Sequence, residues 1–259
     1  MAIEDLFSCR GKVALITGAA SGLGYMFAQT MAEAGADVAC ADIDVDGLAE
    51  AAAAVEAAGR KAIAIRCDVS SEDDVRAMVE RTVENLGGLD ILFNNAGIGQ
   101  FPTPVHELPT EDWKRLIDVD LHGAFYCARE ALKIMVAQRS GKIINISSVW
   151  GFVGSSRLQP CPAYNAAKGA LINFTRELAL CYAPYGINVN AICPGFIKTK
   201  IGNSCSDDPE WVKQALPLVP LGRIGMPAEL KGLALLLASD ASSYMCGDCI
   251  VIDGGYLAG

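Results

Sequence analysis

Short apolar runs alternate with longer segments of helical periodicity along the whole chain. The runs are nearly continuous in apolar residues, which is typical of parallel strands that helices cover on both faces. The pattern predicts strands at residues 12–17, 37–42, 61–67, 89–94, 142–146, 187–193 and 249–252. It predicts helices at residues 22–35, 46–59, 71–86, 110–138, 163–183 and 227–238.

This alternation of strand and helix predicts an α/β fold, a single-domain Rossmann fold with a doubly wound, seven-stranded parallel sheet. No linker, charge run or low-complexity stretch divides residues 1–259, so we expect one domain. In such sheets a ligand binds beyond the carboxyl ends of the strands, where the strand order reverses. Candidate chemistry should therefore lie just after the predicted strands.

Composition narrows the class of protein. A net charge of −9 argues against nucleic acid or an anionic membrane as a partner. The amino terminus lacks the basic and apolar regions of a signal peptide, and the apolar stretch 233–238 is too short to span a membrane. We therefore expect a cytoplasmic protein.

The ten cysteines are scattered along the chain rather than paired. Five of them lie inside apolar patterns and are expected to be reduced core residues, namely Cys40, Cys67, Cys127, Cys181 and Cys193. Cys246 and Cys249 form a single CxxC motif without a second pair or a nearby histidine. Because a zinc site needs four ligands, we expect no metal there.

A glycine-rich turn follows the first predicted strand and opens the first long helix. Its sequence is Thr17-Gly18-Ala19-Ala20-Ser21-Gly22-Leu23-Gly24, with the spacing G-x3-G-x-G rather than G-x-G-x-x-G. Glycines let the backbone approach a pyrophosphate, and a helix amino terminus offers free N–H groups. An ordinary tight turn gives the same pattern, but its place at the first strand end favours a dinucleotide site formed by Gly18, Ser21, Gly22, Leu23 and Gly24.

The second predicted strand ends at Asp42. A carboxylate at this point accepts hydrogen bonds from the adenosine ribose and repels a 2′-phosphate. Neither Ser21 nor Ile43, the residue after Asp42, offers a cation for such a phosphate. Asp42 could instead cap the next helix, although Asp44 and Asp46 are better placed to do so. The pattern favours NAD, with an NADP-preferring ketoreductase as the alternative.

The sequence resembles the short-chain dehydrogenase/reductase family, in its compact form, over essentially its whole length. The motifs that carry the resemblance follow in order as Thr17-Gly18-x3-Gly22-x-Gly24, Cys67-Asp68-Val69, Asn94-Asn95-Ala96-Gly97, Ser148, Tyr164-x3-Lys168 and Pro194-Gly195-x3-Thr199. The resemblance implies further cofactor contacts, with Asp68 and Val69 at the adenine, Asn95, Ala96 and Gly97 beside the central strand, and Pro194, Gly195, Ile197 and Thr199 around the nicotinamide. Considered in isolation, Asp68 could simply cap the following helix, and Pro194-Gly195 could simply form a turn.

Tyr164 and Lys168 lie four residues apart in a predicted helix and therefore share one face. A tyrosine hydroxyl with a pKa of about 10 is a poor base at neutral pH. A nearby ammonium and the positive nicotinamide ring both favour the phenolate, so Tyr164 can exchange a proton with the alcohol. Ser148 can hydrogen-bond the substrate oxygen, and the resemblance selects it over Ser147. We also expect Tyr164 and Lys168 to contact the cofactor.

Two departures from the family pattern concern the same region. Asp120 stands where the family usually has an asparagine, and we count it among the catalytic candidates. A buried carboxylate there disfavours a Tyr164 phenolate and favours a protonated Lys168, so we expect it to be paired with a donor or to share a proton. The segment 149–163 looks longer than usual and is expected to shape the substrate pocket.

The substrate expected from this reading is a small secondary alcohol or ketone. Four aromatic residues near the predicted mouth of the site suggest an apolar or cyclic substrate, although they could equally be packing, and these are Phe101, Trp150, Phe152 and Phe196. Two other readings are a non-catalytic NAD-binding Rossmann protein, and an isomerase or dehydratase that recycles NAD. Loss of Tyr164 or Lys168 would favour the first, and an added carboxyl-terminal substrate domain would favour the second.

The helices predicted at 110–138 and 163–183 carry more apolar residues than one sheet face can cover. The residues in question are Trp113, Leu116, Leu121, Phe125, Leu132, Phe174 and Leu178. The family resemblance implies that these helices pack against a second copy, which gives a homotetramer arranged as a dimer of dimers.

Overall fold

The structure is a computed structural model, and it describes residues 2–199, 201 and 205–259. One seven-stranded sheet runs through it in the order β3-β2-β1-β4-β5-β6-β7, and every neighbouring pair of strands is parallel. The strands are β1 (Val13–Thr17), β2 (Asp37–Asp42), β3 (Ala62–Arg66), β4 (Ile91–Asn94), β5 (Gly141–Ile146), β6 (Ile187–Pro194) and β7 (Cys249–Ile252). The predicted strands and the doubly wound parallel sheet are confirmed, and the structure adds that the strand order reverses between β1 and β4.

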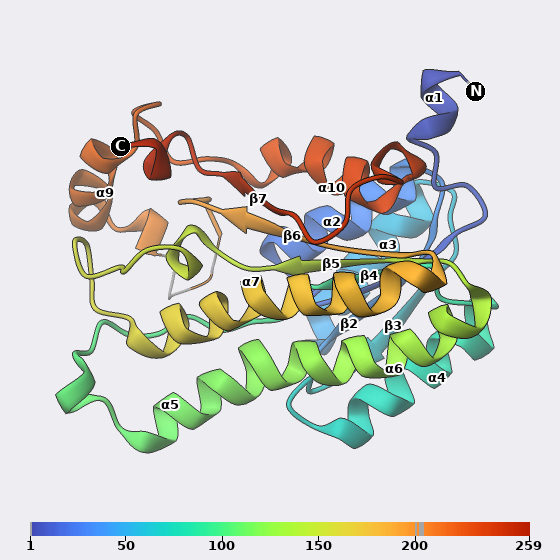
Figure 1. Cartoon of the computed structure of the whole chain (residues 1–259), viewed down its shortest axis with the longest axis horizontal. Coiled ribbons are helices and arrows are strands. Elements are labelled where there is room, and N and C mark those ends of the chain that lie inside the picture. Colours follow the sequence, from blue (N-terminus) through green and yellow to red (C-terminus); the bar gives the residue numbers. More distant parts are fainter. Residues whose placement is uncertain (1, 200, 202–204) are drawn as a thin grey trace.

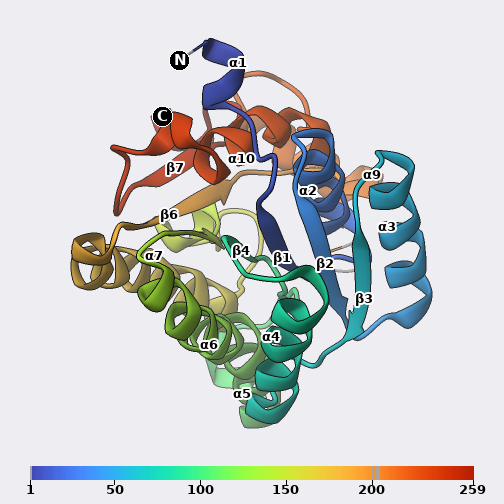
Figure 2. The same ribbon diagram turned by 90° about the vertical axis from the view of Figure 1, so that its right-hand side faces the viewer.

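Helices cover both faces of this sheet (Figures 1 and 2). One face carries α2 (Gly22–Glu33), α3 (Val45–Ala57) and α10 (Lys231–Ala238), and the other carries α4 (Glu72–Leu86), α6 (Gly123–Gln138) and α7 (Pro162–Tyr182). Two short helices, α5 (Thr110–Ile117) and α9 (Pro209–Ala215), lie toward the end of the molecule to which β5 and β6 point (Figure 1). A single turn, α1 (Ile3–Leu6), begins the chain.

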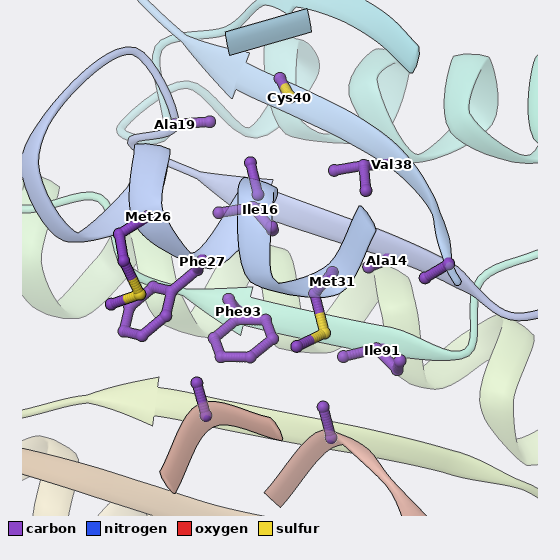
Figure 3. Close-up of a cluster of buried hydrophobic side chains, with 14 of the residues drawn as sticks. Ala14, Ile16, Ala19, Met26, Phe27, Met31, Val38, Cys40, Ile91 and Phe93 are labelled. Carbon is purple, nitrogen blue, oxygen red and sulfur yellow. The ribbon is translucent and has the colours of Figure 1, made fainter. Parts of the chain in front are cut away.

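The core between α2 and the sheet explains why β1 reads as a continuous apolar run. Every residue of β1 is buried, since helices close both of its faces. Phe27 of α2 stacks on Phe93 of β4 with ring centroids 4.8 Å apart, and Met26, Met31 and Ile91 surround the pair (Figure 3). Complete burial of side chains of this size is worth roughly 1.5–3 kcal/mol each. This packing holds the carboxyl ends of β1 and β4 in fixed register.

The structure differs from the expected helices at two places. The helix expected at 110–138 is interrupted by a π-helical segment, Asp118–His122, between α5 and α6. The segment expected as a helix at 227–238 begins as a 3₁₀ helix, Pro227–Leu230, and becomes α10 only from Lys231. Among the described residues, no helix combines the length and apolar character that crossing a membrane requires.

Two expectations about burial are corrected. Cys181 is exposed, because it lies near the end of α7 on the side away from the sheet, where its thiol donates to Glu177 one turn earlier. Cys40, Cys67, Cys127 and Cys193 are buried as expected. Three residues expected at a subunit contact are instead buried within one chain, and these are Leu116, Leu132 and Leu178. Phe125 and Trp113 remain exposed at 41% and 39%.

Candidate active site

A long cleft of about 970 Å³ opens at the carboxyl ends of the strands, where the strand order reverses. It brings together residues from the carboxyl ends of six strands, β1 to β6, and every sequence-predicted cofactor residue except Gly24 lines it. Those lining residues are Gly18, Ser21, Gly22, Leu23, Asp42, Ile43, Asp68, Val69, Asn95, Ala96, Gly97, Tyr164, Lys168, Pro194, Gly195, Ile197 and Thr199. Ser148 lines it as well, whereas Asp120 lies buried behind its wall.

The glycine-rich turn has the shape that a pyrophosphate needs. Gly18 and Gly22 have positive φ values of 67° and 56°, a conformation that favours glycine. Ser21, the residue before α2, makes no side-chain capping bond, so the first N–H groups of α2 are left for a ligand. Gly24 serves packing rather than contact, since a Cβ atom there would lie 2.0 Å from the Gly18 carbonyl oxygen. The turn therefore fits a dinucleotide phosphate.

Asp42 lies at the end of β2 and is held by the backbone on both sides. Its Oδ2 accepts a hydrogen bond from the Ala20 N–H at 3.0 Å, and its Oδ1 accepts one from the Asp44 N–H at 3.1 Å. Each carboxylate oxygen keeps a further lone pair for a ribose hydroxyl. Asp44 itself caps α3 through the Gly47 N–H, so the capping role considered for Asp42 belongs to Asp44. The next side chain, Ile43, is 63% exposed.

The segment after β4 is tied to the glycine turn. Thr17 Oγ1 accepts from the N–H groups of Asn95 and Ala96 at 3.0 Å, and Asn95 Nδ2 donates to the Thr17 carbonyl at 2.8 Å. Asp68 accepts from the backbone N–H and the hydroxyl of Ser70 but does not cap α4, because Ser71 does. Helix capping therefore does not account for Asp68 at the cleft wall.

Tyr164 and Lys168 lie on α7 beside the end of β5. Lys168 Nζ is 5.5 Å from the centre of the Tyr164 ring and donates to the Ile146 carbonyl at 3.1 Å. Ser147 Oγ donates to the Lys168 carbonyl at 2.8 Å and so joins the strand to the helix. Ser148 lines the cleft together with Tyr164, and the two hydroxyls interact. Both serines line the cleft, but the Ser147 hydroxyl is already bonded to the Lys168 carbonyl.

Asp120 forms an ion pair with Lys168 in a buried position. Asp120 Oδ2 is 3.1 Å from Lys168 Nζ, and the two side chains are 0% and 4% exposed. Asp120 Oδ1 also accepts from the Ile98 N–H at 2.8 Å. The π-helical segment places this carboxylate beneath the turn that follows β4, and segments of this kind recur at functional sites. The expectation that Asp120 is paired with a donor is confirmed.

The electrostatic balance at Tyr164 differs from the sequence expectation. Burial raises the pKa of Tyr164 above its ordinary value and the Asp120 carboxylate raises it further, while Lys168 and Ser148 act in the lowering direction. For Lys168, burial alone would lower the pKa, but the Asp120 carboxylate and Tyr164 hold it above its usual range. Burial also raises the pKa of Asp120, against the opposing effect of Lys168 and the Ile98 N–H. In the protein alone, Lys168 does not bring the phenol pKa below its ordinary value.

A smaller pocket of about 110 Å³ adjoins the cleft next to Tyr164. Its aromatic walls meet edge to face, with ring centroids 6.0 Å apart for Trp150 and Tyr164, and 5.2 Å apart for Phe196 and Trp211. The long segment 149–163 contributes Gln159 and Cys161 to it, as expected.

Of the four aromatic residues expected near the mouth of the site, Trp150 and Phe196 line the small pocket and the other two do not. Phe101 is 72% exposed on the larger cleft, and Phe152 is 41% exposed and lines neither cavity. Gln100 and Trp211 were not anticipated. No local signal marks them, because only the fold brings their distant segments to Tyr164.

Comparison with known proteins gives a consistent picture. The family model described as enoyl-(acyl carrier protein) reductase matches residues 18–257. The cis-4-hydroxycyclohexanecarboxylate dehydrogenase of Sinomonas cyclohexanicum is 40% identical over 247 residues, which cover 95% of this chain and 97% of that protein. A solved short-chain type dehydrogenase/reductase from Mycobacterium marinum is 40% identical with a TM-score of 0.95, covering 100% of both chains. A gluconate 5-dehydrogenase from Burkholderia cenocepacia J2315, solved with NADP and tartrate, is 34% identical with a TM-score of 0.93 and covers 100% of both chains.

The chain belongs to the short-chain dehydrogenase/reductase family. It is an NAD(P)-dependent oxidoreductase that acts on CH–OH groups. The expectation of an enzyme is thereby confirmed over a non-catalytic binding protein. Because one of these relatives holds NADP, family membership does not distinguish NAD from NADP.

Proposed function

We propose that this protein interconverts a secondary alcohol and a ketone with NAD, with Tyr164 as the general acid and base. The observation that carries this proposal is the meeting of Ser148, Tyr164 and Lys168 at the junction of the cleft and the small pocket. The glycine turn, Asp42 and the segment after β6 would hold the dinucleotide along the cleft. When bound, the nicotinamide accepts or supplies the hydride.

The three side chains divide the remaining work. The Ser148 hydroxyl donates a hydrogen bond to the substrate oxygen and stabilises the charge that develops there. Tyr164 takes the proton from the alcohol in oxidation and returns it to the ketone oxygen in reduction. Lys168 stays protonated because its pKa is raised, and its charge favours the Tyr164 phenolate over the phenol.

Asp120 acts as a positioning residue for Lys168. Its carboxylate and the Ile146 carbonyl hold the ammonium group from two directions. Its negative charge also offsets part of the help that Lys168 gives to the phenolate. Asp120 therefore fixes the geometry of the lysine while it moderates the acidity of the tyrosine.

The preference for NAD rests on Asp42 and Ile43. The Asp42 carboxylate faces the cleft at the end where the adenosine ribose would lie, and it would repel a 2′-phosphate. Ile43 beside it supplies no cation. We expect kcat/KM to be higher with NAD than with NADP, and equal or better turnover with NADP would overturn this part of the proposal.

The homotetramer is proposed from the α6 and α7 faces. A surface hollow between these helices is lined by Phe125, Phe174 and Tyr182, with the Arg129 guanidinium 5.3 Å from the centre of the Phe125 ring. A second copy would cover these rings. Light scattering at micromolar protein should report four chains, and a monomer would refute the proposal.

The buried free thiols of Cys40, Cys67, Cys127 and Cys193 support a cytoplasmic location.

The experiment that tests the activity is a panel of secondary alcohols and ketones assayed with both cofactors. Oxidation of an alcohol with stoichiometric formation of the reduced nicotinamide is expected. Absence of turnover across polyols, sugar acids, hydroxyacyl thioesters, steroids and cyclic alcohols would overturn the proposed function.

A further inference from the structure

We infer that the substrate carries a second, uncharged oxygen acceptor, which the side-chain N–H groups of Gln100 and Trp150 bind. This inference rests on the proposed function, because it concerns the pocket beside Tyr164. The reacting oxygen would lie at Ser148 and Tyr164, and the second oxygen would lie elsewhere in the same pocket. The proposed substrate is thus a compact cyclic ketone or alcohol with an additional hydroxyl or carbonyl group.

Gln100 presents its amide in a fixed orientation. Its Oε1 accepts hydrogen bonds from the N–H groups of Ala163 and Tyr164 at 2.9 and 3.2 Å, at the start of α7. Only the oxygen of the amide can accept from N–H donors, so these two bonds decide which end is the NH₂ group. Nε2 of Gln100 is buried and has no hydrogen-bond partner. The Gln100 side chain therefore has an unpaired N–H donor close to Tyr164, the proposed general acid and base.

Trp150 carries the second donor. Its indole Nε1 is buried without a hydrogen-bond partner, and its ring stands at 89° to the Tyr164 ring. Trp211 lines the same pocket and offers a direct comparison, because its Nε1 donates to Gln159 Oε1 at 3.0 Å. Of the two tryptophans in this pocket, one is satisfied by the protein and the other is not.

Unpaired buried donors are costly, and native structures pair nearly all of them. Gln100 and Trp150 come from distant segments, yet both line the pocket that contains Ser148 and Tyr164. A substrate oxygen that reaches these groups would supply the acceptor that the protein does not provide. A substrate without that oxygen would leave both donors desolvated and unpaired, and sites of this type discriminate strongly against it.

The walls of the pocket indicate the rest of the substrate. Trp150, Phe196 and Trp211 present ring faces and edges that suit a compact apolar ring. None of the described residues that line this pocket carries a formal charge. An ionised carboxylate at this wall would lose its hydration without gaining a cation. The second acceptor is therefore a hydroxyl or carbonyl oxygen.

The first test compares ring substrates of similar size in the ketone-reducing direction. Cyclohexane-1,4-dione and cyclohexane-1,2-dione each carry a second oxygen, 4-methylcyclohexanone replaces it with a methyl group, and 4-oxocyclohexanecarboxylate adds a charge. Two neutral hydrogen bonds predict that the better dione exceeds 4-methylcyclohexanone by at least about tenfold in kcat/KM. The carboxylate should be a poorer substrate than that dione.

The second test uses a matched pair of variants and reads the ratio of kcat/KM for the better dione to that for 4-methylcyclohexanone. Trp150→Phe removes the unpaired N–H and should lower this ratio about three- to tenfold. Trp211→Phe removes an N–H that the protein already satisfies, and should leave the ratio unchanged even if both rates fall. Gln100→Glu keeps the oxygen that Ala163 and Tyr164 require but replaces the NH₂ group, so it should lower the ratio as well.

The outcomes separate this inference from the proposed function. Efficient reduction of 4-methylcyclohexanone, equal to that of the diones, would overturn the inference and leave the activity intact. Preference for the carboxylate, activity only on acyclic substrates, or an equal change of the ratio in both tryptophan variants would overturn it too. Failure of every alcohol and ketone with both cofactors would instead overturn the proposed function.

Discussion

The cofactor cleft and the substrate pocket meet at Tyr164, but they are built in different ways. The cleft is formed mainly by backbone and short side chains that directly follow strands, such as Gly18 after β1 and Asn95 after β4. The pocket is formed by long side chains from segments that are remote from one another, including Gln100, Trp150 and Trp211. The first is determined by the topology of the sheet, and the second depends on where connecting segments pack.

The largest expected effect lies where the two regions join. Tyr164→Phe removes the hydroxyl and leaves the ring against Trp150, so NAD binding and folding should persist. Loss of general acid–base catalysis should lower kcat by roughly 10²–10⁴-fold. Steady-state kinetics with a parallel titration of NAD would measure both quantities. More than a tenth of the wild-type kcat in this variant would show that another group carries the proton.

A change confined to the cleft should alter the choice of cofactor and leave the pocket unaffected. Asp42→Ala combined with Ile43→Arg removes the repelling carboxylate and adds a cation for a 2′-phosphate. Hydrogen bonds to charged groups of this kind predict a rise of about 10- to 100-fold in the NADP-to-NAD ratio of kcat/KM.

Ile43→Arg alone is the control for this change, because Asp42 also anchors the Ala20 and Asp44 N–H groups. It should raise the ratio less than the double variant and keep the wild-type thermal stability. A double variant that still prefers NAD as strongly as the wild type would show that these two residues do not determine the cofactor preference.

Two helical glycines test whether the cleft depends on close backbone packing. A Cβ atom at Gly24 would meet the Gly18 carbonyl oxygen at 2.0 Å, whereas a Cβ atom at Gly232 in α10 would meet no atom within 4 Å. Gly24→Ala should lower the free energy of unfolding by about 1–3 kcal/mol and weaken NAD binding. Gly232→Ala should leave it unchanged or raise it by about 0.5–1 kcal/mol. Urea unfolding of both variants makes the comparison, and equal stabilities would contradict it.

The same contrast explains how much the sequence could predict. The seven strands and the cofactor positions follow from apolar runs and from the residues directly after them, so Gly18, Asp42 and Asn95 could be placed in advance. The domain assignment of residues 1–259 stays a prediction, as do the roles of the site residues. Gln100 and Trp211 could not be placed, because loop packing and not local pattern brings them to Tyr164. Cys181 was misplaced because an apolar helical stretch does not tell which face is covered.

The π-helical segment shows a further limit of sequence reasoning. The pattern of residues 110–138 reads as one helix, and only the structure reveals that Asp118–His122 is π-helical. The segment turns Asp120 toward Lys168 and leaves Asp118 at the surface beside His122. The departure of Asp120 from the family pattern was visible in the sequence, but the identity of its partner was not.

The smallest effect on rate is expected from Asp120→Asn, which tests the electrostatic balance that both regions share. The amide keeps an oxygen for the Ile98 N–H, but it removes the negative charge and places an NH₂ group, which cannot accept from Lys168, where the second carboxylate oxygen lies. Burial is the largest cause of the raised pKa of Tyr164, and the Asp120 carboxylate adds to it. Removing that charge should therefore lower the pKa of Tyr164. Alcohol oxidation needs the phenolate, so the rise of its rate with pH should move to lower pH. Ketone reduction needs the phenol, so the fall of its rate with rising pH should also begin at a lower pH.

At neutral pH the kcat of this variant should stay within about tenfold of the wild type, because the fold and the proton donor remain. Asp118→Asn is the matched control, since its half-exposed carboxylate pairs with His122 and not with Lys168, and its pH profile should not move. Asp120→Leu should damage both stability and rate, because it leaves the Lys168 ammonium buried without its partner. The decisive measurement is the pH–rate profile of Asp120→Asn. A thousand-fold loss of kcat with the fold intact would mean that the carboxylate takes a direct part in proton transfer, and a profile shifted to higher pH would reverse the sign of the electrostatic argument.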